Sequence, residues 1–445
     1  MTNHTPQSVD SLHAALTLEA MRLGVVPPSD LEQSTVGRDV EIDVVRRDLE
    51  QATVSGARRA FLGDYGLGKS HMLELIEQIA LKQNFLVSKV TLDHAELSPS
   101  QPKRIYHAVL RNLIYPDRPK SLDGIAPLLE KAANCEEVLK KFAIKSDKPM
   151  PRSVREQLAM GLHLYLSPAI AYTRALADEE HLRLPAHVGD KHAWIQTARH
   201  MLIDWIEGHP TQSNQDINDE LNLIHGRFPK IYSLLDYRPW AKIYAYIING
   251  ISQLAKDVGY AGLVVVLDEA EFYSLLSSQN RMFAKSLFQA WSHAVCAEGE
   301  GDLTCSSDEL LTGGYGIQRE LPTRYSDTPG LYLVFAMTPN TDGIRVLQDA
   351  LAPQYICFLN QLTAPDYLQM TAHLVDLYRH AYPSAVIPDG IEAPLSDVVN
   401  ALTQQGQLAN PRQTMKFLTE FLDLVRFEPQ KLPEVIENLM FDSDF

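Results

Sequence analysis

Cysteine is scarce in this sequence, with only four in 445 residues. They are Cys135, Cys296, Cys305 and Cys357, and no two of them form a CxxC pair. A zinc ribbon or a disulfide framework needs paired or regularly spaced cysteines, so this scatter argues against both. We therefore expect buried or surface thiols without a structural role in metal binding.

Long apolar runs and an excess of positive charge are also missing. No apolar run approaches the roughly 20 residues that span a bilayer, and the first segment, Met1–Asp10, is polar. The sequence therefore predicts no membrane span, no signal peptide and a cytoplasmic location. Forty lysines and arginines against 56 acids give a net charge of −16. Because this charge repels phosphate, any contact with DNA must use a local basic patch.

What is present is the composition of a globular protein. Hydrophobic residues make up 45% of the chain and charged residues 22%, which leaves enough apolar surface for large cores. A chain of this length is expected to form about two or three structural units.

The strongest local pattern is a glycine-rich loop that fits GxxxxGK[ST] at every fixed position. Its residues are Gly63, Asp64, Tyr65, Gly66, Leu67, Gly68, Lys69 and Ser70, followed by His71. A short apolar run precedes the loop and a helical pattern follows it, which is the context that this motif requires. Glycines let successive N–H groups converge on phosphate oxygens at a helix N-terminus. The motif predicts ATP binding, with Lys69 at the β- and γ-phosphates and the Ser70 hydroxyl on Mg²⁺.

A second motif combines a buried strand with two acids. Gly262–Leu267 is a continuous apolar run, and Asp268 and Glu269 follow it directly. Such runs are typical of parallel strands that are buried on both faces. We expect Asp268 to bind Mg²⁺ and Glu269 to orient or activate the attacking water, with Glu271 as a minor alternative to Glu269.

The order of elements predicts an α/β fold with a parallel sheet. Strands are expected at Ala60–Leu62, Phe85–Leu92, Gly262–Leu267, Leu331–Met337 and Gln354–Leu359. A helix is expected at Pro102–Ile114. Leu122–Lys256 is helix-like, with loops expected near Lys148–Pro151, Leu184–Gly189 and His209–Asp219. From Ala364 onward the pattern predicts only helices. Lys69 and Asp268 lie 199 positions apart, more than a simple βαβ unit needs, so we interpret most of the intervening segment as a helical insertion.

At this point the sequence resembles a known family, the BrxD-like ATP-binding proteins of bacterial BREX-type phage-defence loci. These proteins belong to the AAA+ class, near the origin-recognition and STAND P-loop ATPases. The resemblance rests on Arg22–Pro27, Val36–Glu41, Phe61–Ser70 and Leu263–Glu271. It implies an AAA+-like P-loop core, ATP hydrolysis with Mg²⁺, a C-terminal helical lid after Ala364, and Val36 to Arg38 beside the adenine. It also implies other defence proteins as partners, and a homo-oligomer.

The resemblance further implies three residues that sense or stabilise the phosphates. Thr338, where asparagine is commoner in the AAA+ pattern, would sense the γ-phosphate; alternatively, its hydroxyl or the Asn340 side chain caps the next helix. Arg412 follows Asn410-Pro411 at a helix start and would reach over the nucleotide, or it is an ordinary exposed arginine. Arg345 occupies the place of an arginine that acts on a neighbouring subunit's ATP, or it is a surface or ion-paired arginine.

These elements suggest four segments. They are the N-terminal helices with the first part of the ATPase core (1–115), the insertion (116–245), the second part of the core (246–362) and the lid (363–445). Within the insertion lies a cluster of basic residues: Lys140, Lys141, Lys145, Lys148, Arg152 and Arg155. This cluster is a candidate DNA contact, although a solvated basic face explains it as well.

The sequence thus predicts an ATPase that remodels or loads a partner on DNA in a phage-defence complex. The alternative is a nucleotide-controlled binding switch or scaffold with little turnover, since binding needs only the loop whereas hydrolysis also needs Glu269. A small-molecule kinase would need an acceptor pocket, for which the sequence gives no signature.

Overall fold

The computed structural model describes residues 9–26, 31–119, 122–144, 153–184, 188–209, 214–221, 223–224, 228–295 and 320–441. The chain divides into two compact units. The first, which we call the helical unit, comprises Met1–Val45, Gly63–Gln78 and Phe358–Phe445. The second, the sheet unit, comprises Arg46–Leu62 and Ile79–Cys357.

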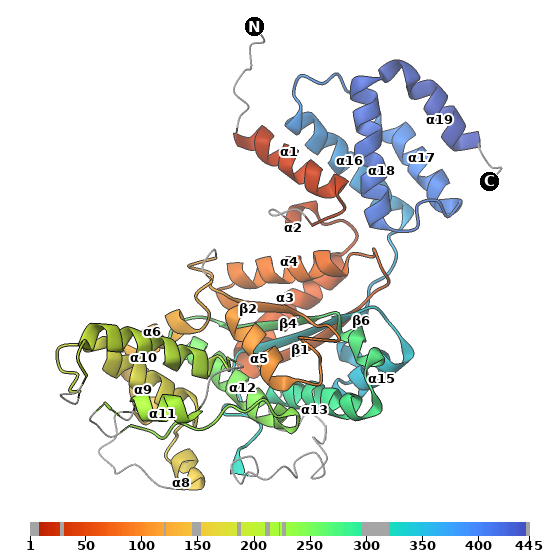
Figure 1. Ribbon diagram of the computed structural model, residues 1–445. Helices are drawn as coiled ribbons and strands as arrows, with labels where there is room; N and C mark the ends of the chain where they lie inside the picture. Colours follow the sequence, from red (N-terminus) through yellow and green to blue (C-terminus); the bar gives the residue numbers. More distant parts are fainter. Residues whose placement is uncertain are drawn as a thin grey trace. The chain divides into compact units, whose positions relative to one another are not determined.

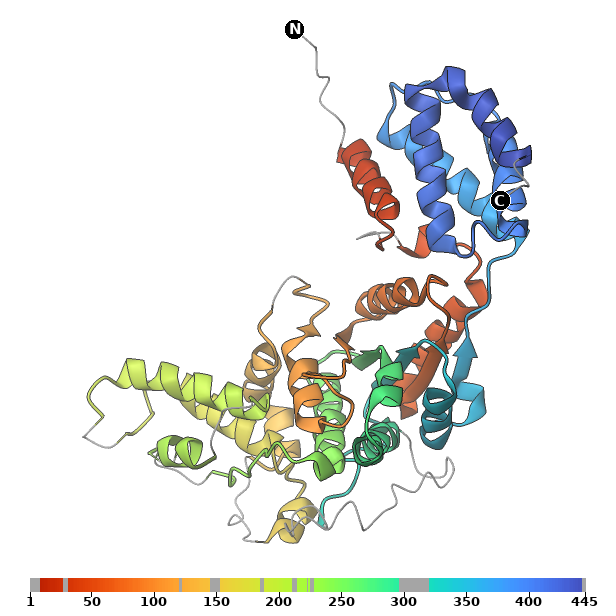
Figure 2. The ribbon, with the colours of Figure 1, turned by 45° about the vertical axis from the view of Figure 1, so that its right-hand side comes forward.

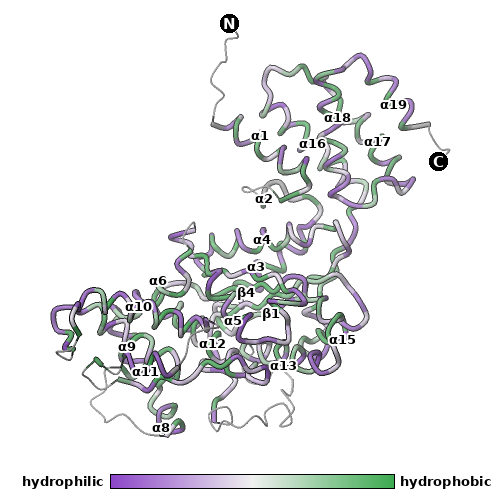
Figure 3. The backbone as a smooth tube through the Cα atoms, viewed as in Figure 1, coloured by the Kyte–Doolittle hydropathy of each residue, from purple (hydrophilic) through white to green (hydrophobic). Residues whose placement is uncertain are grey.

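A six-stranded sheet forms the centre of the fold. Its strands are β1 (Ala57–Leu62), β2 (Phe85–Thr91), β3 (Leu113–Ile114), β4 (Gly262–Asp268), β5 (Leu331–Met337) and β6 (Ile356–Phe358), in the order β3-β2-β4-β5-β1-β6. β2, β4, β5 and β1 pair in parallel. β4 and β5 are buried along almost their whole length, as a parallel sheet covered on both faces requires. Figure 3 shows green, the hydrophobic colour, around its β4 label. The predicted α/β class and parallel sheet are confirmed.

The expected end of one helix is wrong. The helix predicted over 102–114 is α5 (Pro102–Arg111), and the chain beyond it forms β3. Leu113 pairs with Ser88 and Ile114 with Val87, antiparallel to β2. The helix gives way to a strand because β2 would otherwise present unpaired N–H and C=O groups on this side. Burial of Leu113 accompanies the pairing.

Three helices cover one face of the sheet. α5, α12 (Ala241–Asp257) and α13 (Ser278–Val295) pack against β2, β4, β5 and β1, and Figures 1 and 2 show them on the same side. α3 (Asp39–Ser55) lies on the other side, where Asp48 accepts hydrogen bonds from Arg59 and from Tyr332 Oη. α15 (Thr341–Ala350) packs against α13.

The described residues between β3 and α12 form a series of helices. They are α6 (Ala126–Ala133), α7 (Glu136–Lys141), α8 (Val154–Ala159), α9 (Leu166–Ala177), α10 (Lys191–Ile206) and α11 (Asn214–Leu221). α6, α7 and α9 pack on α12, and Figure 1 shows the yellow-green helices gathered beside it. The hydrophobic core of the sheet unit runs without a break from the strands into these helices.

The helical unit has its own core. α16 (Ala364–Ala381), α17 (Glu392–Gln404), α18 (Pro411–Phe427) and α19 (Leu432–Phe441) form a bundle, which α1 (Val9–Arg22) joins by packing on α16 and α18. Figure 1 shows α1 in red beside the blue C-terminal helices. Arg22 and Asp423 form an ion pair at 2.5 Å across this contact. α1, which we expected with the first part of the ATPase core, thus belongs to the unit of the C-terminal helices.

The helical unit also contains the short helix α2 (Leu31–Ser34) and the first part of α4 (Lys69–Lys82). None of the helices in the described part of the chain is long and apolar enough to cross a membrane.

Candidate functional site

The glycine-rich loop lies between the end of β1 and the start of α4. Gly66 and Gly68 have φ angles of 85° and 96°, in the left-handed region that favours glycine. Leu67 N donates to Asp64 O at 3.2 Å, and Met72 N donates to Gly68 O at 2.9 Å where α4 begins. A turn of this kind, followed by a helix N-terminus, directs backbone N–H groups toward one point. The loop therefore has the local geometry of an anion-binding site.

The basic side chain of this loop folds back over it. Lys69 Nζ donates to Gly63 O at 2.8 Å, and its side chain is half-buried. Ser70, in the first turn of α4, is exposed, as are Asp64 and Tyr65. The ammonium group and the hydroxyl that we expect at the phosphates and at Mg²⁺ thus come from the start of one helix.

Arg38 links three parts of the helical unit. Its guanidinium donates to Leu67 O at 2.9 Å and to Asn360 O at 2.8 Å, and it forms an ion pair with Glu41 at 3.3 Å. Only 5% of Arg38 is exposed. A buried guanidinium needs such partners, because an unpaired buried charge is strongly unfavourable. Arg38 therefore holds the glycine-rich loop by its backbone; its expected place beside an adenine, with Val36, stays a prediction.

His71 is fixed in one neutral tautomer. Thr35 Oγ1 donates its hydrogen to Leu31 O at 2.5 Å, so at 2.7 Å from His71 Nε2 it accepts a hydrogen bond from that nitrogen. Burial, and then the nearby Arg38 charge, lower the pKa of His71 to about 4. At neutral pH this side chain is an uncharged donor that ties α4 to the segment before α3.

Arg412 reaches the glycine-rich loop from α18. Its guanidinium donates to Tyr65 Oη at 2.8 Å, and its Cζ lies 5.0 Å from the centroid of the Tyr65 ring. Beside it, Asn410 caps α18 by accepting from Gln413 N at 3.1 Å. A Cβ at Gly66 would lie only 2.5 Å from Asn410 Cγ, so this contact requires glycine. Sequence reasoning missed the pair Tyr65 and Arg412, because nothing local signals a contact across 347 positions.

In the sheet unit, the two acids stand where β4 ends. Asp268 is its last residue, and one carboxylate oxygen of Asp268 accepts from Glu269 N at 2.8 Å. Glu269 has φ 57° and ψ 35°, a left-handed conformation that costs a non-glycine residue roughly 1–2 kcal/mol. Such strain persists only where the surroundings enforce it, and it clusters at functional sites. Glu271 follows in the 3-10 helix η2 (Ala270–Leu275), and its Oε2 is buried without a hydrogen-bond partner in the described structure.

The strand register brings three strand ends to one edge of the sheet. Leu267 pairs with Phe335, and Leu62 pairs with Met337, so β4, β5 and β1 all end there. Thr338 follows β5 directly. Asn340 Oδ1 accepts from Gly343 N at 2.8 Å and caps α15. The Asn340 cap, one of the two alternatives for this segment, is confirmed, whereas the role of Thr338 stays a prediction.

Two other predicted groups lie on helices. Arg345 is exposed on α15, and no carboxylate of the described residues forms an ion pair with it. Of the basic cluster, Lys141 forms an ion pair with Asp257 at 2.8 Å, and Lys140 and Arg155 are exposed. The other members, Lys145, Lys148 and Arg152, lie outside the described residues.

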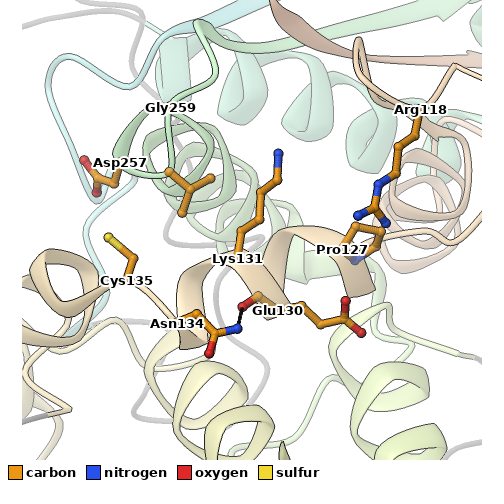
Figure 4. Close-up of a pocket in the computed structure, with 9 residues that line it drawn as sticks. Arg118, Pro127, Glu130, Lys131, Asn134, Cys135, Asp257 and Gly259 are labelled. Carbon is orange, nitrogen blue, oxygen red and sulfur yellow. Dashed lines mark hydrogen bonds between the residues drawn. The ribbon is translucent and has the colours of Figure 1, made fainter.

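A pocket of about 650 Å³ lies between α6 and the C-terminal end of α12 (Figure 4). Arg118, Glu130, Lys131 and Asp257 are among its lining residues. Lys131 Nζ already donates a hydrogen bond to Asp117, at 2.9 Å. α12 ends shortly before Gly262, the first residue of β4, whereas Asp268 is the last residue of that strand. The pocket therefore lies toward the opposite end of β4 from Asp268. It is therefore separate from the acids at the strand ends.

Comparison with known proteins is informative at the level of the family. A family model described as "BREX system ATP-binding protein BrxC/D" matches residues 10–293, well over half of the chain. The match includes the glycine-rich loop and both acids at the end of β4. A comparison with curated proteins finds no match. The extent of the family match shows that this chain belongs to the BREX system ATP-binding proteins BrxC/D.

Proposed function

We propose that this chain binds ATP at the loop 63–70 and hydrolyses it with Mg²⁺, as a P-loop ATPase of the AAA+ type. The observation that carries the proposal is the glycine-rich loop itself, with left-handed Gly66 and Gly68 and a helix that begins at Lys69. Its backbone N–H groups and the Lys69 ammonium group provide the positive charge that polyphosphate needs. Membership of an ATP-binding family supports the same ligand.

The donor set fits a magnesium ion. A carboxylate (Asp268) and a hydroxyl (Ser70) supply the hard oxygen ligands that Mg²⁺ prefers, with water and phosphate oxygens completing the shell. The ion would neutralise charge on the β- and γ-phosphates. In support, β1 and β4 end at the same edge of the sheet, and the loop follows β1 without an intervening residue.

Glu269 would orient the attacking water and accept its proton. Its left-handed backbone conformation and the hydrogen bond from its N–H to the Asp268 carboxylate fix the position of its Cα–Cβ bond. Thr338 would donate a hydrogen bond to the γ-phosphate. Arg412 would act on the nucleotide from the C-terminal helices, which we propose to be the lid; its contact with Tyr65 already brings it to the loop.

The family match supports a role in phage defence. We propose that the ATPase cycle remodels or loads a partner on DNA within a cytoplasmic defence complex, with other defence proteins as partners. The exposed Lys140 and Arg155 of the basic cluster are candidates for contact with DNA phosphates. A homo-oligomer would allow Arg345 to act on the ATP of a neighbouring subunit.

Steady-state phosphate release tests the proposal. The purified chain is incubated with ATP and Mg²⁺, with and without DNA, beside a Lys69→Ala variant as a blank. We expect release that requires Mg²⁺ and is lost in the variant. Tight ATP binding without release under all these conditions would replace hydrolysis by a nucleotide-controlled switch.

A further inference from the structure

Arg281, in the first turn of α13, is partly exposed and still contacts four other residues. Its Nε donates to Leu276 O at 3.0 Å, and a second nitrogen donates to Ser274 O. A third nitrogen forms an ion pair with Asp342 at 2.8 Å. Its Cζ lies 5.7 Å from the centroid of the Tyr273 ring. One guanidinium thus contacts the backbone of the segment 274–276 and the carboxylate of Asp342.

These two segments follow neighbouring strands. Ser274 and Leu276 lie at the end of the turn that begins at Glu269, directly after β4. Asp342 lies in the first turn of α15, four residues after Thr338 and shortly after β5. Because β4 and β5 pair in parallel, both segments start at the same edge of the sheet. Arg281 therefore ties the segment that carries Glu269 to the segment that carries Thr338.

The strain at Glu269 explains why such a tie is needed. A left-handed glutamate persists only where the surrounding structure enforces it. At one end of the turn, the Asp268 carboxylate holds the Glu269 N–H. At the other end, Arg281 holds the carbonyls of Ser274 and Leu276. A planar fork of donors can bind two carbonyls and a carboxylate together, whereas the single ammonium of lysine cannot reproduce this geometry.

We propose that Arg281 is a positioning residue for ATP hydrolysis, which fixes the Glu269 turn against the start of α15. The inference rests on the proposed function. Arg281 acts through Glu269 and Thr338, so it should govern the rate of the chemical step. It should leave ATP affinity nearly unchanged, because its partners Ser274, Leu276 and Asp342 belong to the sheet unit, whereas the loop 63–70 belongs to the helical unit.

The chain offers a matched control on the same two helices. Lys285, one turn further along α13, forms an ion pair with Asp349 of α15 at 2.8 Å. The Lys285 and Asp349 side chains are 42% and 48% exposed, close to the 33% and 41% of Arg281 and Asp342. No hydrogen bond from Lys285 to the turn 270–276 is present among the described residues. Loss of Lys285 therefore removes an ion pair between α13 and α15 and leaves the hydrogen bonds that hold the Glu269 turn in place.

The experiment compares Arg281→Met, Arg281→Lys and Lys285→Met with wild type in three measurements: kcat for phosphate release, ATP affinity by calorimetry, and thermal unfolding. We expect Arg281→Met to lower kcat by about tenfold or more, since small misplacement of a catalytic group is costly in rate. Arg281→Lys should restore only part of this loss. Lys285→Met should keep kcat within about twofold of wild type, because exposed ion pairs contribute little.

An Asp342→Asn variant tests the same contact from its other side, in case the Arg281 variants misfold. It removes one arm of the contact and should lower kcat less than Arg281→Met; combined with Arg281→Met it should add little, since the two changes break one network. Wild-type kcat in Arg281→Met would overturn the inference. So would equal losses of kcat and stability in Arg281→Met and Lys285→Met. Absence of phosphate release by wild type instead rejects the proposed hydrolysis, and the inference falls with it.

Discussion

At the scale of single residues, two charged groups carry the proposed chemistry. Lys69 provides the positive charge of the glycine-rich loop, and its ammonium group donates to Gly63 O within that loop. Glu269 provides the carboxylate, on a backbone held left-handed after Asp268. Neither belongs to the hydrophobic core of its unit. Each can therefore be replaced with little effect on the free energy of unfolding.

Replacement of Lys69 by alanine should lower ATP affinity by at least about tenfold, because the charge facing the β- and γ-phosphates is lost. Calorimetry measures the affinity, and thermal unfolding shows whether the fold survives. Lys82→Ala, at the exposed end of the same helix, is the control and should bind ATP as wild type does. Unchanged affinity of the Lys69 variant would show that the loop is not the ATP site.

Glu269→Gln keeps the size of the side chain and removes the proton acceptor. We expect ATP to bind while kcat falls by about 100-fold or more, the usual contribution of a general base. Single-turnover phosphate release measures the effect. Glu271→Gln is tested in parallel, because its buried Oε2 lacks a partner in the described structure. If Glu271→Gln abolishes turnover and Glu269→Gln does not, Glu271 is the general base.

At the scale of elements, the start of α9 depends on a histidine. His163 Nδ1 accepts hydrogen bonds from the backbone N–H groups of Tyr165 and Leu166 at 3.2 and 3.0 Å. Its ring stacks on Tyr246, with the centroids 4.3 Å apart, and is fully buried. Burial lowers the pKa of His163 to about 3. Protonation would place a hydrogen on the nitrogen that must accept these bonds.

The segment around α9 should therefore lose stability in mild acid. The folded-state pKa of His163 lies below its unfolded value of about 6.5, so its contribution is complete above that value and is lost as pH falls toward about 3. Between pH 7 and pH 5 the free energy of unfolding should drop by about 2 kcal/mol from this group alone. Urea unfolding at both pH values measures the drop.

His163→Gln is the matched variant for this test, since an amide oxygen can accept a hydrogen bond but does not titrate in this range. We expect it to be less stable than wild type at pH 7 and to show a smaller difference between the two pH values. His71 and His293 add to the drop in both proteins, because burial lowers the pKa of each to about 4. An equal pH dependence in the two proteins would contradict the assignment to His163.

At the scale of the whole molecule, the proposed homo-oligomer would let one subunit complete the ATP site of its neighbour. Arg345 is exposed on α15 and makes no ion pair with the described residues. It lies on the same helix as Asp342 and Asp349, both of which are held by α13. A rigid helix that presents a free guanidinium is suited to contact a neighbouring subunit's phosphates, where such an arginine can add several powers of ten in rate.

Mixing two inactive variants tests this assembly. Lys69→Ala lacks the phosphate-binding charge, and Arg345→Ala would lack the arginine supplied to the neighbour. If the arginine acts in trans, mixed assemblies should regain part of the ATPase activity, since one kind of interface combines an intact loop with an intact arginine. Each variant alone serves as the baseline. Normal turnover by Arg345→Ala alone would refute the role of Arg345.

Much of the fold follows from local patterns, and the deviations from them have physical reasons. The strand β5 was predictable to the residue, because a fully buried parallel strand is an unbroken apolar run. The end of α5 was not, because Leu113 and Ile114 become a strand only by pairing with β2. The cap of α15 was predictable as one of two alternatives, since Asn340 precedes the helix directly.

The sequence by itself determined the glycine-rich loop, the buried strands and the acids at the end of β4. These depend on backbone preferences of glycine and on the period of apolar residues, which act over a few positions. Only the tertiary structure decided that α1 joins the C-terminal helices, that Arg412 meets Tyr65, and that Arg281 joins the segments after β4 and β5. Such contacts join residues tens to hundreds of positions apart, so they depend on the path of the whole chain, which no local pattern encodes.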